Sequence, residues 1–222
     1  MDAWQTIDRV YTLAAKLLRT VIIAKAPIPG FTKTRLIPAL GEEGATCLAE
    51  KLLQNTVASV LEADLGKIEL CVTPAPESSA WARHEFANVE WTSQVDGDLG
   101  ARMAQCARNA VSCGESVLII GTDCPVLDSS ALQRAAGALT TCDSCLIPVL
   151  DGGYVLLGLN NFDTSLFSNI PWGTDQVSEI TQERIKELGW SCALLPALYD
   201  IDEPDDLVRL PSEFLPMGGE NT

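Results

Sequence analysis

Positive charge is scarce in this chain of 222 residues, in which 15 Lys and Arg stand against 30 Asp and Glu and give a formal net charge of -15. A nucleic-acid-binding protein needs a basic face for the phosphate backbone, so we expect no nucleic-acid partner. An anionic small molecule remains a candidate ligand if positive charge or a metal ion is concentrated at one place.

Histidine and paired metal-binding cysteines are also scarce. The chain has one His, and its eight Cys include a single CxxC, Cys142 to Cys145, without a second such pair. Structural zinc sites usually take four Cys or His ligands at paired spacings, so we expect no zinc at this motif. The other cysteines are scattered through apolar contexts, as is typical of free thiols in a reducing cytosol.

Long apolar runs are missing. The stretch at residues 17–28 is interrupted by Arg19 and Lys25, whereas a membrane span needs about 20 largely apolar residues. The first residues contain Asp2 and no basic segment, so we expect no secretory signal. Together these features predict a cytoplasmic protein without a membrane span.

Apolar residues are plentiful, at 47% of the chain, and the length suits one α/β domain over residues 1–222 with a short tail at 211–222. We expect helices over residues 3–19, 42–61, 78–86, 99–112, 128–139 and 174–188, and strands over residues 20–24, 67–73, 89–92, 116–121, 144–149, 155–159 and 191–195. This alternation predicts a three-layer α/β/α sandwich with a mostly parallel mixed sheet. Ligands of such sheets bind beyond the carboxyl ends of the strands.

Three cations follow the first predicted strand closely: Lys25, Lys33 and Arg35. Pro27 fixes its own φ and Gly30 permits a positive φ, so the loop can direct backbone N–H groups and cations toward one anion. Its spacing matches neither a Walker A loop nor a dinucleotide-binding turn. We expect a phosphate-binding loop; a solvated surface loop is the alternative.

Three carboxylates occupy positions suited to a metal. Asp123 stands at the end of the strand over 116–121, where an Asx-turn before the next proline would also explain it. Asp200 and Asp202 alternate in an extended segment, which puts both on one face about 7 Å apart. A helix N-cap is the alternative for Asp202. If the three carboxylates converge, they make an all-oxygen site for Mg²⁺ or Mn²⁺.

Four other features carry open interpretations. Arg102 begins a predicted helix and either contacts a phosphate or base or pairs with an acid. The segment 151–154, Asp-Gly-Gly-Tyr, predicts a tight turn into an antiparallel strand, and its glycines would also let an acceptor approach the backbone. For Trp172 we expect packing rather than stacking on a ligand, and for His84 an exposed side chain.

Seven motifs occur in a fixed order along the chain: Lys25–Gly30, Lys33–Leu36, Asp98–Met103, Thr122–Pro125, Asp151–Tyr154, Pro171–Thr174 and Asp200–Asp202. As a set, from about residue 20 to 208, they resemble the DUF2064 family, also called selenodomain-associated transferase 1, of the nucleotide-diphospho-sugar transferase superfamily. The chain departs from typical nucleotidyltransferases of that superfamily because a proline-containing loop replaces their Gly-x-Gly-x-Arg loop.

The resemblance implies a GT-A type fold with a nucleotide over the strand ends. By that resemblance the nucleotide and its phosphates would contact Lys25, Pro27, Gly30, Lys33, Thr34, Arg35 and Arg102. The metal ligands would be Asp123, Asp200 and Asp202, the catalytic residues Lys33, Arg35 and Asp123, and the acceptor-binding residues Asp151, Gly152, Gly153 and Tyr154.

The function expected from these features is metal-dependent transfer from a nucleotide-sugar or nucleoside triphosphate donor to a small-molecule acceptor, with Mg²⁺ or Mn²⁺ as cofactor. Two alternatives accompany glycosyl transfer. One is a nucleotidyltransferase that joins a phosphorylated small molecule to a nucleotide. The other is a catalytically silent nucleotide-binding module, because function depends on the site rather than on the fold.

Overall fold

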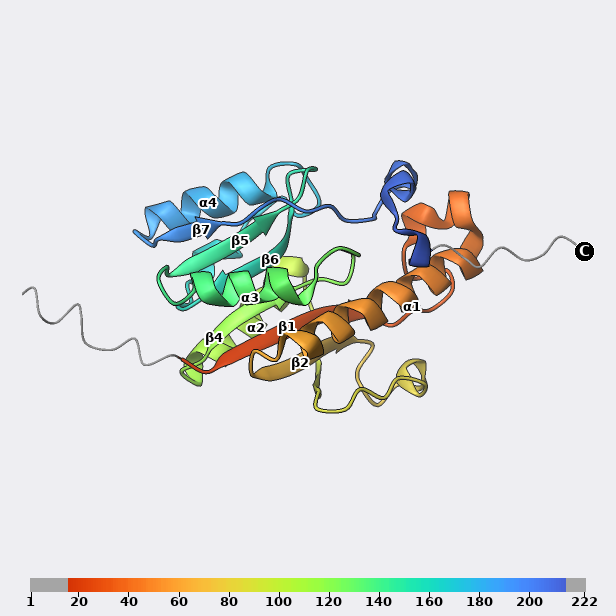
Figure 1. Ribbon diagram of the computed structural model, residues 1–222, viewed down its shortest axis with the longest axis horizontal. Helices are drawn as coiled ribbons and strands as arrows, with labels where there is room; N and C mark the ends of the chain where they lie inside the picture. Colours follow the sequence, from red (N-terminus) through yellow and green to blue (C-terminus); the bar gives the residue numbers. More distant parts are fainter. Residues whose placement is uncertain (1–15, 215–222) are drawn as a thin grey trace, which may run out of the picture.

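A seven-stranded sheet forms the centre of the computed structural model, which describes residues 16–214 (Figure 1). The strands are β1 (Leu18–Lys25), β2 (Lys67–Thr73), β3 (Glu90–Ser93), β4 (Ser116–Ile120), β5 (Ser144–Pro148), β6 (Tyr154–Leu159) and β7 (Cys192–Leu194). Their order is β3-β2-β1-β4-β6-β5-β7, and β6 alone of these seven runs antiparallel to its neighbours. The mostly parallel mixed sheet is therefore confirmed.

Two layers of helices cover the sheet. The α-helices are α1 (Ile37–Ala63), α2 (Leu99–Ser112), α3 (Ser129–Ala138) and α4 (Val177–Glu187). Because side chains alternate along a strand, Ile22 of β1 packs in one buried cluster with residues of α1 and α3, and Val21 packs in another with residues of α2 and α4. Figure 1 shows α1 and α3 on the same face of the sheet, which confirms the three-layer arrangement.

A third buried cluster joins the start of α1 to the last described residues. Leu36 and Ile201 are both fully buried in it, and Phe214 is 6% exposed. Leu36 follows the predicted phosphate loop directly and Ile201 lies between the two predicted metal-binding aspartates, so this packing fixes one segment against the other. Phe214, in the segment 211–222 expected to form a tail, is thus packed into this cluster.

Two predicted helices differ from the structure. Most of the helix expected over residues 3–19 lies outside the described residues, and its last two residues belong to β1. The helix expected over residues 78–86 is reduced to one 3₁₀ turn, Ser79–Trp81, preceded by a cis peptide bond to Pro74. There the Trp81 indole donates to the Pro74 carbonyl (2.8 Å), so packing overrides the helical pattern.

His84 was expected to be exposed, and this is wrong: its side chain is 8% exposed and its Nε2 lies 2.8 Å from Glu50 Oε2 on α1.

Of two residues considered as helix N-caps, the structure confirms one. Asp128 caps α3, as expected, by accepting a hydrogen bond from the Ala131 N–H (2.7 Å). The cap of the 3₁₀ helix Pro204–Arg209 is Glu203 rather than Asp202, which leaves the Asp202 side chain available for other contacts.

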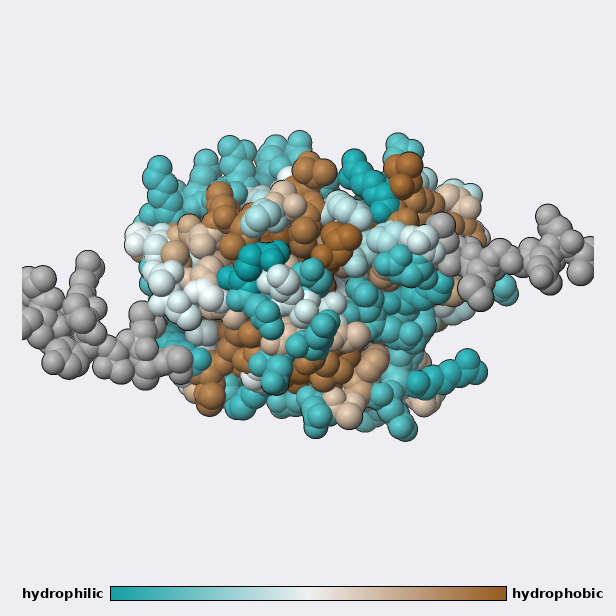
Figure 2. Space-filling view, viewed as in Figure 1, coloured by the Kyte–Doolittle hydropathy of each residue, from teal (hydrophilic) through white to brown (hydrophobic). Residues whose placement is uncertain are grey.

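The surface mixes polar and apolar side chains over the face that α1 and α3 cover (Figure 2). Among the described residues, the three most exposed large apolar side chains are Phe31 and Leu150, in two separate loops, and Val208, in the 3₁₀ helix Pro204–Arg209. None of the helices in the described part of the chain is long and apolar enough to cross a membrane.

Candidate active site

Asp123, Asp200 and Asp202 lie in one region at the carboxyl ends of the parallel strands. Asp123 follows β4, and the segment that carries the other two runs past the end of β5, where the Leu198 N–H donates to the Pro148 carbonyl (3.0 Å). Farther along, the Ile201 N–H donates to the carbonyl of Asp123 (3.0 Å). These backbone bonds place two acids from the end of the chain beside one from its middle.

Lys33 lies between two of these acids. Its Nζ contacts Asp123 Oδ1, donates to Asp202 Oδ1 at 2.8 Å, and donates to the Ile201 carbonyl at 2.6 Å. The side chain is only 7% exposed. Burial favours the neutral amine, but the Asp123 and Asp202 carboxylates outweigh it and raise the pKa of Lys33. Lys33 is therefore a buried ammonium ion rather than a surface cation.

Among residues 16–214, Asp200 has no such ammonium partner. Burial, together with the nearby Asp151, Asp202 and Asp123 carboxylates, raises the pKa of Asp200 to about 6. A hard divalent cation prefers a set of oxygen ligands like this one, and binding it would remove the mutual repulsion of the acids. The described residues at this point fit Mg²⁺ or Mn²⁺ by the chemistry of their donor atoms.

A pocket of about 300 Å³ opens beside Asp200 and Asp202. It is lined by Arg35, Leu150, Asp151, Gly173, Thr174, Asp175, Tyr199, Asp200, Asp202, Glu203, Asp206 and Arg209. Six carboxylates thus face two guanidinium groups. Both guanidinium groups already lie close to acids, since Arg35 contacts Glu203 at 3.1 Å and Arg209 approaches Asp206 at 3.9 Å. The pocket is strongly acidic.

The turn between β5 and β6 forms one wall of the pocket through Asp151. Gly152 has a φ of +91°, and a Cβ there would lie 2.0 Å from the Asp175 carbonyl oxygen. The glycine thus lets the turn pack on the segment that precedes α4. The Gly153 N–H donates to Asp151 Oδ1 (3.1 Å). Tyr154 points elsewhere, because its hydroxyl is buried near Met103 of α2 and does not line the pocket.

The predicted phosphate loop is held by its own side chains. The Thr32 hydroxyl donates to the Ala26 carbonyl (2.6 Å), and Gly30 has the positive φ of +76° that was expected of it. Lys25 and Thr34 are exposed, whereas Pro27 is half-buried at the start of the turn. The loop therefore presents Lys25 to solvent at the end of β1 and directs Lys33 inward.

Arg102 lies on the other side of the strand ends, at the start of α2. Its Nη1 donates to Gln94 Oε1 (3.0 Å), and the Gln94 amide in turn donates to the carbonyls of Ala24 and Cys71 (2.8 and 2.9 Å). The buried Nε of Arg102 has no hydrogen-bond partner among the described residues. Neither Gln94 nor its role was predicted, since a single Gln after a strand carries no pattern.

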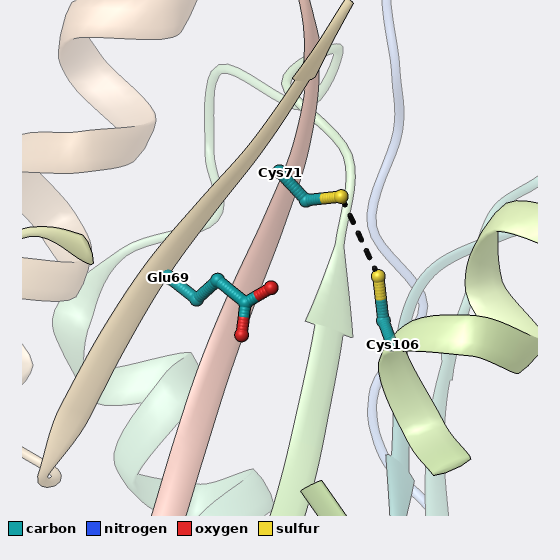
Figure 3. Close-up of side chains that lie close together, drawn as sticks. All are labelled: Glu69, Cys71 and Cys106. Carbon is teal, nitrogen blue, oxygen red and sulfur yellow. Dashed lines mark hydrogen bonds between the residues drawn. The ribbon is translucent and has the colours of Figure 1, made fainter. Parts of the chain in front are cut away.

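A second cluster of metal-ligand atoms, also unforeseen, lies beneath α2. Glu69 and Cys71 of β2 point toward Cys106 of α2, whose thiol donates to Cys71 at 3.6 Å (Figure 3). That hydrogen bond lowers the pKa of Cys71 and raises that of Cys106. Both Glu69 oxygens are already engaged, one by Arg19 and one by Thr92. The cluster is sealed in the core and its carboxylate is already paired, so we assign it a structural role.

Solved structures share this fold. A candidate nucleotide-diphospho-sugar transferase of Desulfovibrio desulfuricans G20 is 26% identical, with a TM-score of 0.78 over 85% of this chain and 83% of that chain. A nucleotidyl transferase of Methanothermobacter is 20% identical, with a TM-score of 0.57 over 89% and 97%. Rv0371c of Mycobacterium tuberculosis H37Rv, in complex with manganese, is 14% identical, with a TM-score of 0.54 over 87% and 97%. The fold is therefore the GT-A-like nucleotide-diphospho-sugar transferase type.

No curated protein matches the sequence. The sequence profile of DUF2064, described as an uncharacterized protein conserved in bacteria, matches residues 56–174. The matched range holds Arg102, Asp123 and the 151–154 turn, whereas Lys33 and Asp202 lie outside it. Because that range spans more than half of the 222 residues, the chain belongs to the DUF2064 family.

Proposed function

We propose that this protein is a divalent-metal-dependent glycosyltransferase that uses a nucleotide-sugar donor and an acceptor without a phosphate group. The observation that carries the proposal is that Asp200 and Asp202 line a pocket beyond the strand ends, next to Asp123, which shares the Lys33 ammonium group with Asp202. A shared fold alone would not suffice, because the same fold hosts different activities.

The proposed roles follow from the positions of the side chains. Asp123, Asp200 and Asp202 would hold Mg²⁺ or Mn²⁺, which when bound supplies positive charge next to the donor's diphosphate. Lys25 and Arg35 lie on the loop at the edge of this site and would bind phosphate oxygens, stabilising the charge that develops as the sugar–phosphate bond breaks. Arg102, at the start of α2 beyond the strand ends, would contact the nucleotide through its guanidinium group.

The charge of the pocket favours one kind of acceptor. Six carboxylates line it, and both arginines lie close to acids. Such a lining repels a phosphorylated acceptor and suits hydroxyl or amino groups. This supports glycosyl transfer over the joining of a phosphorylated molecule to a nucleotide. We propose that Asp151, positioned by the turn through Gly152 and Gly153, forms the acceptor side of this pocket.

Nucleotidyl transfer remains the second candidate, because the Methanothermobacter neighbour is named a nucleotidyl transferase. The two reactions release different products. Glycosyl transfer leaves a nucleoside diphosphate or monophosphate and consumes a nucleotide sugar, whereas nucleotidyl transfer consumes a triphosphate and releases pyrophosphate.

A panel of nucleotide sugars and nucleoside triphosphates, each with and without Mg²⁺ or Mn²⁺, tests the proposal. Ligands that bind the folded state raise its melting temperature, so a nucleotide sugar should stabilise the protein only when metal is present. Asp200→Asn should abolish that metal-dependent shift, while Asp205→Asn, an exposed residue outside the pocket lining, should retain it.

Product analysis then separates the alternatives. Pyrophosphate released from a triphosphate would establish nucleotidyl transfer instead. Binding without turnover against hydroxyl and amine acceptors would support the silent module, and a metal-dependent shift that survives in Asp200→Asn would contradict the assigned site.

A further inference from the structure

The ammonium group of Lys33 lies between Asp123 and Asp202, where an ion bridging the same oxygen of each carboxylate would lie. It contacts one oxygen of each carboxylate and donates to the Ile201 carbonyl at 2.6 Å. Divalent ions sit 2.0–2.6 Å from carboxylate oxygens, so an ion bound by the same two oxygens would fall almost on the Lys33 nitrogen. The two cations exclude each other both by space and by charge.

We propose that Lys33 is an internal cation that fills the metal site until a divalent ion displaces it, and that the displaced ammonium group then turns to the donor's phosphates. The inference rests on the proposed function, because it assumes that Asp123, Asp200 and Asp202 bind the ion. Under this proposal, Lys33 pairs with the carboxylates when no metal is bound and with the donor's diphosphate when metal is bound.

The surroundings of Lys33 support this exchange. Three nearby aspartates with no counter-ion would repel one another, and the ammonium group neutralises two of them, so the site can keep its shape without metal. The Lys33 backbone holds a φ of +51°, which is uncommon for a residue other than glycine and turns the side chain inward.

Metal binding then has to break the charge-assisted contacts of Lys33. Removing the competitor should tighten metal binding, and a contact of this kind corresponds to a change of roughly ten- to a hundredfold in the dissociation constant. Removal of any nearby positive charge would also strengthen the binding of a metal cation, so the experiment needs a control variant that loses the same charge. Arg35 serves because it borders the same pocket but pairs with Glu203 instead of the metal-site acids.

The first experiment titrates Mn²⁺ into the full-length wild type, Lys33→Gln and Arg35→Gln and measures heat of binding. Lys33→Gln should bind Mn²⁺ roughly ten- to a hundredfold more tightly than wild type, and Arg35→Gln should change affinity by much less. Equal tightening in both variants would mean that only the overall charge matters, which would overturn the displacement.

The second experiment uses the wild type alone, so it stands even if Lys33→Gln fails to fold. An amine-acetylating reagent followed by mass spectrometry measures the reactivity of each lysine. Lys33 should be protected without metal and react severalfold faster at saturating Mn²⁺, whereas the exposed Lys186 on α4 should not change. Bound Mn²⁺ with Lys33 still protected would overturn the inference and leave the proposed metal site intact. No Mn²⁺ binding by any of the three proteins would refute the metal site itself.

Discussion

Asp200 and Asp202 are two residues apart, yet replacing each by Asn should shift the stability of the metal-free protein in opposite directions. Asp202 accepts a hydrogen bond from the Lys33 ammonium group at 2.8 Å, and the Lys33 side chain is 7% exposed. Asp202→Asn therefore removes part of the charge that keeps a buried cation stable. Asp200 faces other carboxylates instead, so Asp200→Asn removes repulsion.

The sizes of the two effects follow from exposure. Losing a hydrogen bond to a charged group costs about 1.5–3 kcal/mol. The Asp202 side chain is 40% exposed and the Asn oxygen can still accept from Lys33, so we expect a loss of about 1 kcal/mol. Asp200→Asn should gain about 0.5–1 kcal/mol by relieving partly screened repulsion. For a protein of this size, 1 kcal/mol shifts the melting temperature by about 2–4 °C.

Thermal unfolding at neutral pH in the presence of a chelator measures both shifts. Asp205→Asn is the control, because Asp205 is exposed and lies outside the pocket, and it should melt close to the wild type. A rise in melting temperature for both Asp200→Asn and Asp202→Asn would refute the reasoning. That result would mean that the acids repel one another without Lys33 between them.

Three further predictions concern the scaffold and the loop. The hydrogen bond from Arg19 lowers the pKa of Glu115 below its usual 4.5. The ionised carboxylate therefore stabilises the fold above that pH, and this stabilisation is lost as the pH falls and the group is protonated. In urea unfolding, the difference in stability between wild type and Glu115→Gln should become smaller as the pH is lowered from about 5 to about 3. Gly152→Ala should lower the melting temperature, because its Cβ would meet the Asp175 carbonyl at 2.0 Å, while Gly137→Ala in α3, with open space around its Cβ, should leave it unchanged or raise it. Arg35→Gln should hardly change the melting temperature, since its pair with Glu203 is exposed, but should weaken nucleotide binding in calorimetry roughly ten- to a hundredfold; an unchanged affinity would exclude Arg35 from the phosphate site.

The sheet was predictable because local patterns and packing agree there. The buried strand β4 is a continuous apolar run, and α2 was placed at Leu99–Ser112, as the structure has it. Strict alternation around the fully buried Ile201 also predicted that Asp200 and Asp202 share a face. Each of these predictions depends on a period that the core enforces.

Other features could not be predicted because they depend on contacts between distant parts of the chain. The helical spacing at residues 78–86 is overridden by the buried Trp81. The His84 side chain is only 8% exposed and pairs with Glu50 of α1, 34 positions earlier in the chain. The inward turn of Lys33 depends on acids 90 and 169 positions away in sequence, at Asp123 and Asp202. Sequence spacing therefore identified the charged residues of the site, but it did not predict which cation pairs with which carboxylate.

The pairing of these cations with carboxylates determines how the cluster of positive charge can bind an anion in so acidic a protein. In the structure, Lys33 is paired with Asp123 and Asp202, and Arg35 is paired with Glu203. A polyphosphate therefore does not meet a ready basic face here; it must draw these cations away from carboxylates that need a replacement charge. A divalent ion provides that charge, so by reciprocal linkage nucleotide and metal should each tighten the binding of the other. Equal nucleotide affinity with and without metal would show that the loop cations are released by some other means.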